Sequence, residues 1–144
     1  MLKVAQKRSI LIVDDEFSVR ESLRMILKSR YEVHTAADGK EALHCIQKDK
    51  IDLVTLDLKM PGLSGIEVLR EIKKKYADIE VIVISAYGTP QNFREATSYG
   101  IGGFIAKPFN LSDIINSIRK SLDRRSYNLK LKNFSRYNSI VIKD

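Results

Sequence analysis

Short apolar runs alternate with helix-length amphipathic segments along most of this chain of 144 residues. Buried strands of a parallel sheet carry continuous aliphatic runs, whereas the helices between them repeat apolar residues every three to four positions. The pattern therefore predicts an α/β fold in which five strands alternate with five helices. In chain order, the predicted strands cover about residues 9–13, 31–36, 52–56, 80–84 and 103–106.

The predicted helices carry ordinary start signals. Asp38 with Glu41 three residues later is a capping box that opens the second helix, and Thr89-Pro90 suits the start of the fourth. Asn110 is the expected cap of the fifth helix, whose apolar stripe fades at about residue 124. Apolar faces are expected to include Ala42, Cys45 and Ile46 in the second helix and Phe93, Ala96 and Thr97 in the fourth.

Four of the apolar runs end abruptly in an ionisable or hydroxyl residue. The carboxyl ends of parallel strands meet along one edge of a sheet, which is where such folds build their sites. The sequence therefore gathers three carboxylates, a hydroxyl and an ammonium at one place. These residues are Asp14 and Asp15 after the first strand, Asp57 after the third, Ser85 after the fourth and Lys107 after the fifth.

This set of side chains suits phosphoryl transfer with a divalent cation. Three converging carboxylates repel one another unless a cation lies among them, although one residue of the Asp14-Asp15 pair could instead cap the following helix. Oxygen ligands without nearby His or Cys favour Mg²⁺ or Mn²⁺. Lys107 and Ser85 add donors that can stabilise phosphoryl oxygens. The chain has no G-x-x-x-x-G-K motif, so the phosphoryl group must come from a small donor or another protein.

Four motifs, in this order and spacing, resemble the receiver domain of two-component response regulators over residues 9–124. The resemblance implies a doubly wound, flavodoxin-like parallel sheet with strand order 2-1-3-4-5. The motifs are Val13-Asp14-Asp15, the block from Asp57 to Gly65 (DLKMPGLSG), Ser85-Ala86 and Lys107-Pro108-Phe109.

The resemblance implies a role for each site residue. Asp57 would be the phosphoacceptor, and Lys107 would pair with the phosphoryl oxygens. The Asp15 and Asp57 side chains and the backbone carbonyl of Lys59 would bind Mg²⁺, with Asp14 acting through a water molecule. The donor would be a sensor histidine kinase or a phosphotransfer protein. The chain would not be an enzyme beyond its own phosphorylation and dephosphorylation.

The resemblance also implies a switch and a cis peptide bond. Ser85 and Phe104 would form the switch pair, which would alter an output surface made by the fourth helix, fifth strand and fifth helix and support a homodimer. Many relatives carry Tyr where this chain has Phe104 and Thr where it has Ser85. The Lys107-Pro108 bond would be cis.

Two alternatives stay open. A Mg²⁺-dependent phosphatase of the haloacid-dehalogenase type also uses an aspartate after the first strand, but it needs a second aspartate two positions on. This chain has Asp14-Asp15-Glu16 instead. The other alternative is an interaction domain of the same fold that is never phosphorylated.

The net charge of +7 does not establish nucleic-acid binding. Residues 125–144 hold five basic residues and one acidic residue, whereas the remainder holds 20 basic and 17 acidic residues. No helix-turn-helix or zinc-ligand pattern is present, so nucleic acid would be contacted only through an output domain absent from this chain. Without a signal peptide or an apolar run of membrane-spanning length, a cytoplasmic protein with no membrane partner is expected.

The expected domain organisation is a receiver domain over residues 1–124 followed by a basic tail or linker over residues 125–144. Ser, Asn, Lys and Arg are frequent in this last segment, with scattered Leu and Phe. It could be a frayed extension of the fifth helix, a linker into a further domain or a disordered tail. The apolar run Ile140-Val-Ile142 slightly favours the linker.

Overall fold

A computed structural model describes residues 6–142, and its centre is one five-stranded parallel sheet with strand order β2-β1-β3-β4-β5. All four neighbouring pairs of strands are parallel. The predicted fold class and strand order are therefore confirmed. The strands are β1 (Ser9–Val13), β2 (Glu32–Ala36), β3 (Leu53–Leu56), β4 (Glu80–Ser85) and β5 (Gly103–Ala106).

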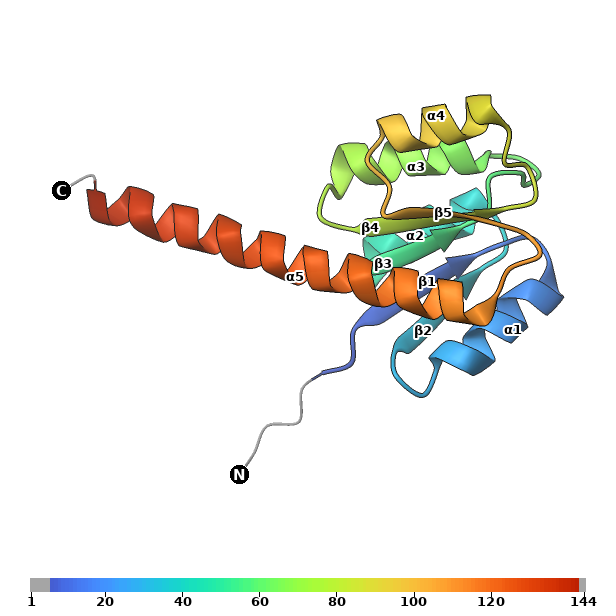
Figure 1. Cartoon of the computed structure of the whole chain (residues 1–144), viewed down its shortest axis with the longest axis horizontal. Helices are drawn as coiled ribbons and strands as arrows, with labels where there is room; N and C mark the ends of the chain where they lie inside the picture. The colour runs from blue at the N-terminus through green and yellow to red at the C-terminus, as the bar shows by residue number, and fades with distance from the viewer. Residues whose placement is uncertain (1–5, 143–144) are drawn as a thin grey trace.

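The five helices cover both faces of the sheet, with α1 and α5 on one side and α2, α3 and α4 on the other (Figure 1). Residues of β1 alternate between the two resulting cores, since Ile10 and Ile12 pack with α1 and α5 while Leu11 and Val13 pack with the other helices. The helices are α1 (Phe17–Leu27), α2 (Gly39–Lys48), α3 (Gly65–Lys75), α4 (Pro90–Ser98) and α5 (Leu111–Ile142).

The predicted helix caps are present as hydrogen bonds. The side chain of Asp38 accepts from the backbone N–H of Glu41 at 2.8 Å, and that of Thr89 accepts from Asn92 at 3.1 Å. Asn110 accepts from the backbone N–H of Ser112 at 2.8 Å. These contacts satisfy helix N–H groups that lack a partner within the helix.

Helix α4 is less buried than its pattern predicts. Ala96 is fully buried, but Phe93 is 49% exposed and Thr97 is also exposed. Phe93 packs on the ring of Phe104 in β5, with ring centroids 5.5 Å apart and an edge-to-face angle of 67°. This helix therefore buries a narrower face than the sequence suggested.

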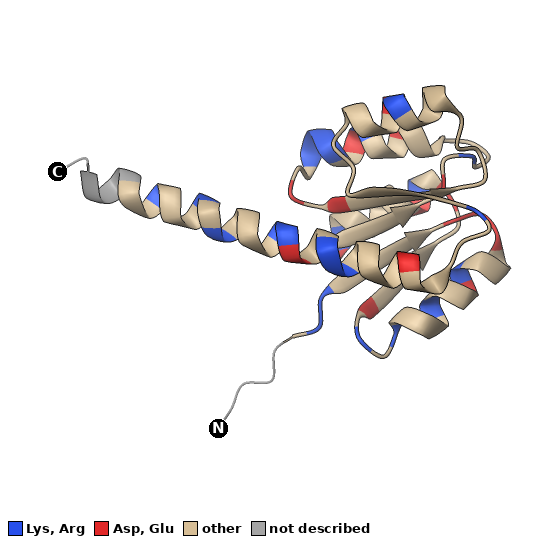
Figure 2. Ribbon diagram, in the orientation of Figure 1, with Lys and Arg blue, Asp and Glu red and all other residues tan. Residues whose placement is uncertain are grey.

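Helix α5 does not end near residue 124 but continues to Ile142 and extends beyond the sheet (Figure 1). Of the three possibilities for residues 125–144, the structure shows an extension of the fifth helix over residues 125–142, and residues 143 and 144 lie outside the described part of the chain. The division into a receiver domain over residues 1–124 and a basic tail or linker stays a prediction. Lys and Arg residues recur along this part of the helix (Figure 2). Two of them, Arg125 and Lys132, pair with acids of the domain, as Arg124 does just before them. These long-range contacts support the helix where its apolar pattern fades. None of the helices described over residues 6–142 is both long and apolar enough to cross a membrane.

Candidate functional site

The site lies at the carboxyl edge of the sheet, where three polar residues each follow directly on a strand. Backbone hydrogen bonds continue the sheet by one residue at each position. The N–H of Asp57 donates to Val13 (3.0 Å) and that of Lys107 donates to Ser85 (3.0 Å). The N–H of Asp14 donates to Ala36 (3.2 Å). The sheet itself therefore positions these side chains, as the strand ends predicted.

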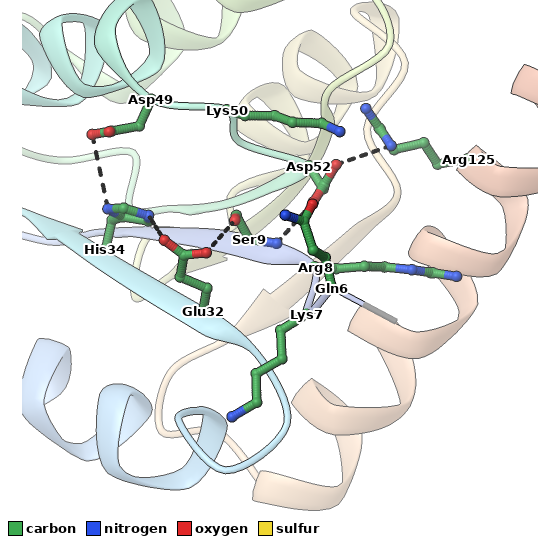
Figure 3. Close-up of a pocket in the computed structure, with 10 residues that line it drawn as sticks. All are labelled: Gln6, Lys7, Arg8, Ser9, Glu32, His34, Asp49, Lys50, Asp52 and Arg125. Atoms are coloured by element: carbon green, nitrogen blue, oxygen red, sulfur yellow. Dashed lines mark hydrogen bonds and ion pairs between the residues drawn. The ribbon is translucent and has the colours of Figure 1, made fainter. Parts of the chain in front are cut away.

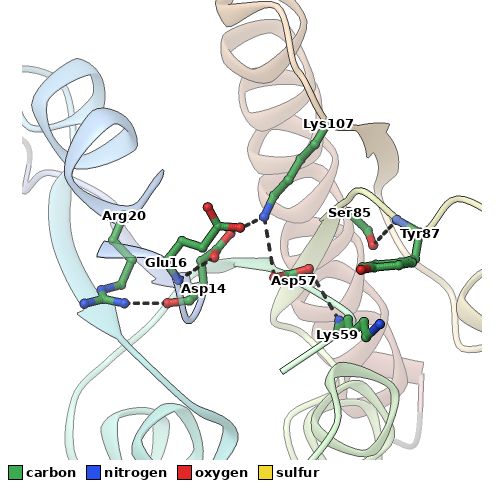
Figure 4. Close-up of polar contacts among 8 residues, drawn as sticks. All are labelled: Asp14, Glu16, Arg20, Asp57, Lys59, Ser85, Tyr87 and Lys107. Atoms are coloured by element: carbon green, nitrogen blue, oxygen red, sulfur yellow. Dashed lines mark hydrogen bonds and ion pairs between the residues drawn. The ribbon is translucent and has the colours of Figure 1, made fainter. Parts of the chain in front are cut away.

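Lys107 connects two buried carboxylates (Figure 4). Its Nζ lies 2.7 Å from Oδ2 of Asp14 and 3.5 Å from Oδ2 of Asp57. Asp14 is only 3% exposed and Asp57 only 5% exposed. Two buried acids thus share one ammonium group, which leaves an excess of negative charge at this edge.

A third carboxylate completes an acidic cluster. One carboxylate oxygen from each of Asp14, Asp15 and Asp57 lies within 4.8 Å of the others, and Asp15 is exposed. Such a set of oxygen atoms fits Mg²⁺ or Mn²⁺, which prefer carboxylates, carbonyls and water. The structure thus brings together the three acids that the sequence grouped from distant segments.

A cavity of about 370 Å³ opens above this cluster. Asp57 lies in its wall, so a small donor or a partner side chain can reach its carboxylate. The loop after β3 is held close to α3, since a Cβ atom on Gly65 would lie 2.2 Å from the carbonyl oxygen of Asp57. The cavity is lined by Asp15, Glu16, Asp57, Lys59, Met60, Pro61, Ala86, Tyr87 and Lys107.

Burial and charge shift the pKa values of the two central groups. Burial raises the pKa of Asp57, the neighbouring charge of Asp14 adds to this, and Lys107 offsets it only in part. Burial also disfavours the charged form of Lys107, but the hydrogen bond and charge of Asp14, aided by Asp57, outweigh that effect and raise its pKa. Lys107 therefore stays an ammonium, while the Asp57 carboxylate lacks a full counter-charge.

Asp14, the first of the two aspartates after β1, is held in place by neighbouring groups. Oδ1 of Asp14 accepts from the backbone N–H of Glu16 at 2.9 Å, and Arg20 donates to the backbone carbonyl of Asp14 at 2.7 Å. The contact of Arg20 was not predicted from the sequence, although its place one turn into α1 was a usable signal. Tyr87, whose ring centroid lies 4.2 Å from Nζ of Lys59, was not predicted either.

The two residues expected to form a switch, Ser85 and Phe104, make their described contacts with residues other than Asp57. Ser85 is fully buried, and its Oγ accepts from the backbone N–H of Tyr87 at 3.0 Å. Phe104 is partly exposed and lies against Phe93 of α4.

Two further expected residues lie beside Asp57 or Lys107. The backbone nitrogen of Lys59 lies 3.4 Å from Oδ1 of Asp57. The Lys107-Pro108 peptide bond is cis.

Residues 10–119 match the family described as the response regulator receiver domain, and the chain belongs to this family. It is 38% identical over 118 residues to sporulation initiation phosphotransferase F of Bacillus subtilis (strain 168), covering 81% of this chain and 95% of that protein. It is also 38% identical to the response regulator MprA of Mycolicibacterium vanbaalenii, covering 80% of this chain and about half (50%) of that relative.

Solved structures agree with this assignment. A CheY-like receiver domain protein from Methanospirillum hungatei JF-1 superposes with a TM-score of 0.83 at 30% identity, over 85% of this chain and 99% of that chain. NtrX from Brucella abortus, solved with ADP, also gives a TM-score of 0.83 at 31% identity. The match covers 90% of this chain but only 30% of NtrX.

Proposed function

We propose that Asp57 accepts a phosphoryl group from a sensor histidine kinase or a phosphotransfer protein, in a reaction that depends on Mg²⁺. The observation that carries this proposal is the buried Asp57 carboxylate, which faces an open cavity beside two further acids and Lys107. Membership in the receiver family supports the same assignment. As a receiver, the chain acts as a signalling domain that modifies itself and has no separate substrate to turn over.

The carboxylate of Asp57 is the nucleophile. One of its oxygens forms a bond to phosphorus while the bond from phosphorus to the donor nitrogen breaks in line with it. The electron pair goes to that nitrogen, which leaves as a neutral imidazole when the donor is a phosphohistidine whose other ring nitrogen carries a proton. Lys107 exchanges its contact with Asp57 for the new phosphoryl oxygens.

Asp15, Asp57 and the backbone carbonyl of Lys59 would hold Mg²⁺, and Asp14 would act through a water molecule. A cation bound there supplies positive charge to the phosphoryl oxygens. Asp14 also keeps Lys107 in place, because their ion pair of 2.7 Å is shorter than the contact of Lys107 with Asp57. Within the acidic cluster, Asp15 and Asp57 would therefore be direct ligands, whereas Asp14 positions Lys107.

Ser85 and Phe104 form the proposed switch. Phosphorylation adds acceptor oxygens beside Ser85, whose hydroxyl then turns from the backbone of Tyr87 toward the phosphoryl group. This movement opens space into which Phe104 rotates, leaving its contact with Phe93. The surface formed by α4, β5 and α5 therefore changes shape when Asp57 is phosphorylated.

The same surface is the proposed homodimer contact, and α5 offers an extension of it. Tyr127, Leu131 and Phe134 follow one another at spacings of four and three residues and are 63%, 46% and 63% exposed. By helical periodicity they lie opposite the stripe of Ile118 and Leu122 that packs on the sheet. A disulfide between two copies of Leu131→Cys, in a Cys45→Ser background, tests this contact. Equal cross-linking of Arg136→Cys, on another face of the helix, would count against it.

A direct test of the phosphoacceptor uses acetyl phosphate with Mg²⁺ and intact-mass measurement. The wild-type chain should gain one phosphoryl group, and Asp57→Asn should gain none. Asp52→Asn, which changes a buried aspartate at the opposite edge of the sheet, is the matched control and should still be modified. A full adduct on Asp57→Asn would place the acceptor elsewhere.

The same variants separate the alternatives once turnover of a phosphomonoester is measured beside the mass. A phosphatase with Asp14 or Asp15 as nucleophile would turn over a phosphomonoester after Asp57 is replaced, whereas an unphosphorylated interaction domain would give no adduct with any variant.

We further propose a cytoplasmic location, because histidine kinases make their phosphodonor from ATP there. Any contact with nucleic acid would need an output domain of the kind present in longer regulators.

A further inference from the structure

A second group of potential metal ligands lies between the edge strand β2 and the end of α2. It consists of His34 in β2, Cys45 in α2 and Asp49 immediately after α2. Each offers one donor atom, and these three atoms lie within 4.8 Å of one another. Nδ1 of His34 is 3.9 Å from Oδ2 of Asp49, and Sγ of Cys45 is 3.8 Å from the same oxygen. A nitrogen, a sulfur and an oxygen donor therefore converge at one point.

The other ring nitrogen of His34 has a partner of its own. Nε2 lies 3.4 Å from Oε1 of Glu32, and the second oxygen of Glu32 accepts from the hydroxyl of Ser9 at 3.4 Å (Figure 3). A histidine that binds a metal through one nitrogen usually donates its other N–H to a carboxylate or carbonyl. Glu32 thus orients His34 so that Nδ1 faces Cys45 and Asp49.

The group is accessible from solvent. His34, Cys45 and Asp49 are each half-buried, and His34, Asp49 and Glu32 lie in the wall of a cavity of about 540 Å³. This cavity is distinct from the one above Asp57, since the two share no lining residue. An ion can therefore reach these ligands without passing through the phosphoryl site.

We propose that His34, Cys45 and Asp49 bind Zn²⁺, with Glu32 holding His34 and water completing the coordination. Zn²⁺ takes Cys, His and Asp ligands at about 2.0–2.3 Å in a tetrahedron, which places the donors about 3.3–3.8 Å apart. The two separations of 3.8 and 3.9 Å are close to that range and the third lies within 4.8 Å, so side-chain rotations can close the site. On binding, the thiol of Cys45 releases its proton to solvent and binds as a thiolate.

The donor chemistry separates this site from the acidic cluster at Asp57. A thiolate and an imidazole favour Zn²⁺ over Mg²⁺, whereas three carboxylates suit Mg²⁺. Zn²⁺ bound here joins β2 to the end of α2, two elements that otherwise meet through packing and the long contact of 3.9 Å between His34 and Asp49. We therefore expect it to stabilise this side of the domain and to leave phosphorylation of Asp57 intact.

Cobalt titration of the full chain, in the presence of excess Mg²⁺, tests the site. Co²⁺ bound to a thiolate absorbs in the near ultraviolet, and Cys45 is the single cysteine of the chain. Cys45→Ser should abolish the band and His34→Asn should weaken binding strongly. Glu32→Gln should weaken it about tenfold. Zn²⁺ added afterwards should displace Co²⁺ and remove the absorption.

The chain supplies its own control, because it has two histidines and the other, His44, is exposed and outside the group. His44→Asn should bind Co²⁺ as the wild type does. Should Cys45→Ser fail to fold, Zn²⁺ should still slow alkylation of Cys45 in the wild type, and a chelator should restore the rate. Absence of a thiolate band, unchanged alkylation with Zn²⁺, or equal loss in His44→Asn overturns the proposal. Asp57→Asn should bind normally, so failure here is distinguishable from failure of the proposed phosphorylation.

Discussion

The buried carboxylates at the two edges of the sheet differ in the number of cationic side chains that pair with them. At the carboxyl edge, Asp14 and Asp57 share the single ammonium of Lys107. At the amino edge, each of the two buried acids has an arginine of α5 as its partner. Arg124 binds Glu80 through two hydrogen bonds of 3.1 and 2.9 Å, and Arg125 lies 3.1 Å from Asp52.

This difference indicates that the acids at the amino edge have a structural role, whereas those at the carboxyl edge are placed to bind a ligand. At the amino edge each of the two buried carboxylates is neutralised by an arginine. These ion pairs hold α5 to the starts of β3 and β4 and leave no unpaired negative charge on them to attract a cation. At the carboxyl edge the acids outnumber the cations, and burial raises the pKa of Asp57. Unmatched negative charge beside an open cavity favours binding of a divalent cation, which the matched edge does not.

The largest effect is expected from breaking the matched edge. Arg125→Met should lower the free energy of unfolding by about 3 kcal/mol, because it leaves the buried Asp52 carboxylate unpaired. Urea denaturation followed by circular dichroism measures this. Asp52→Asn combined with Arg125→Met should recover part of the loss. Equal losses in the single and double variants would mean that Arg125 acts through packing alone.

A smaller effect of opposite sign is expected at the unmatched edge. Without Mg²⁺, Asp57→Asn should raise the free energy of unfolding at neutral pH by on the order of 1 kcal/mol, since it removes a buried charge next to Asp14. Mg²⁺ should stabilise the wild type and have little effect on the variant. Destabilisation by Asp57→Asn would show that Lys107 already compensates both acids.

The same residue predicts a pH dependence. The folded pKa of Asp57 is raised, so the folded chain keeps this proton to a higher pH than the unfolded chain does. Without Mg²⁺, the contribution of Asp57 to stability should fall as pH rises from the ordinary carboxyl pKa of about 3.9 through its raised value. Unfolding curves of the wild type and Asp57→Asn over this range should therefore diverge as pH increases.

The smallest effect is expected from the outermost ion pair of α5. Lys132 contacts Asp78, whose pKa this contact lowers, but their side chains are 53% and 48% exposed. Lys132→Ala should change the free energy of unfolding by about 0.5 kcal/mol or less, because solvent screens exposed pairs. A loss as large as that of Arg125→Met would show that the helix beyond residue 126 contributes to the stability of the domain.

The sequence predicted those features whose signal lies within one short segment of the chain. The aliphatic runs predicted the strands, and the abrupt change to Asp14, Asp57 and Lys107 predicted their meeting at one edge, because parallel strands end together. The caps at Asp38 and Thr89 were also predictable, since a cap bonds only to the next turn.

The end of α5 was not predictable in this way. Its apolar stripe fades near residue 124, yet Arg124, Arg125 and Lys132 pair with acids 44 to 73 positions earlier in the chain. Periodicity within one helix carries no information about such partners. The packing of Phe93 was not predictable from its own helix either, because its partner ring is that of Phe104 in β5.

The sequence by itself determined the order of elements, the fold class and the set of residues at the strand ends, since these follow from hydrophobic periodicity and motif spacing. Only the tertiary structure decided that Asp14 is buried while its neighbour Asp15 is exposed, and that Lys107 is shared unequally between two acids. It alone also brought His34 beside Cys45 and Asp49. Burial and distances between side chains arise from packing of distant segments, which no single stretch of sequence encodes.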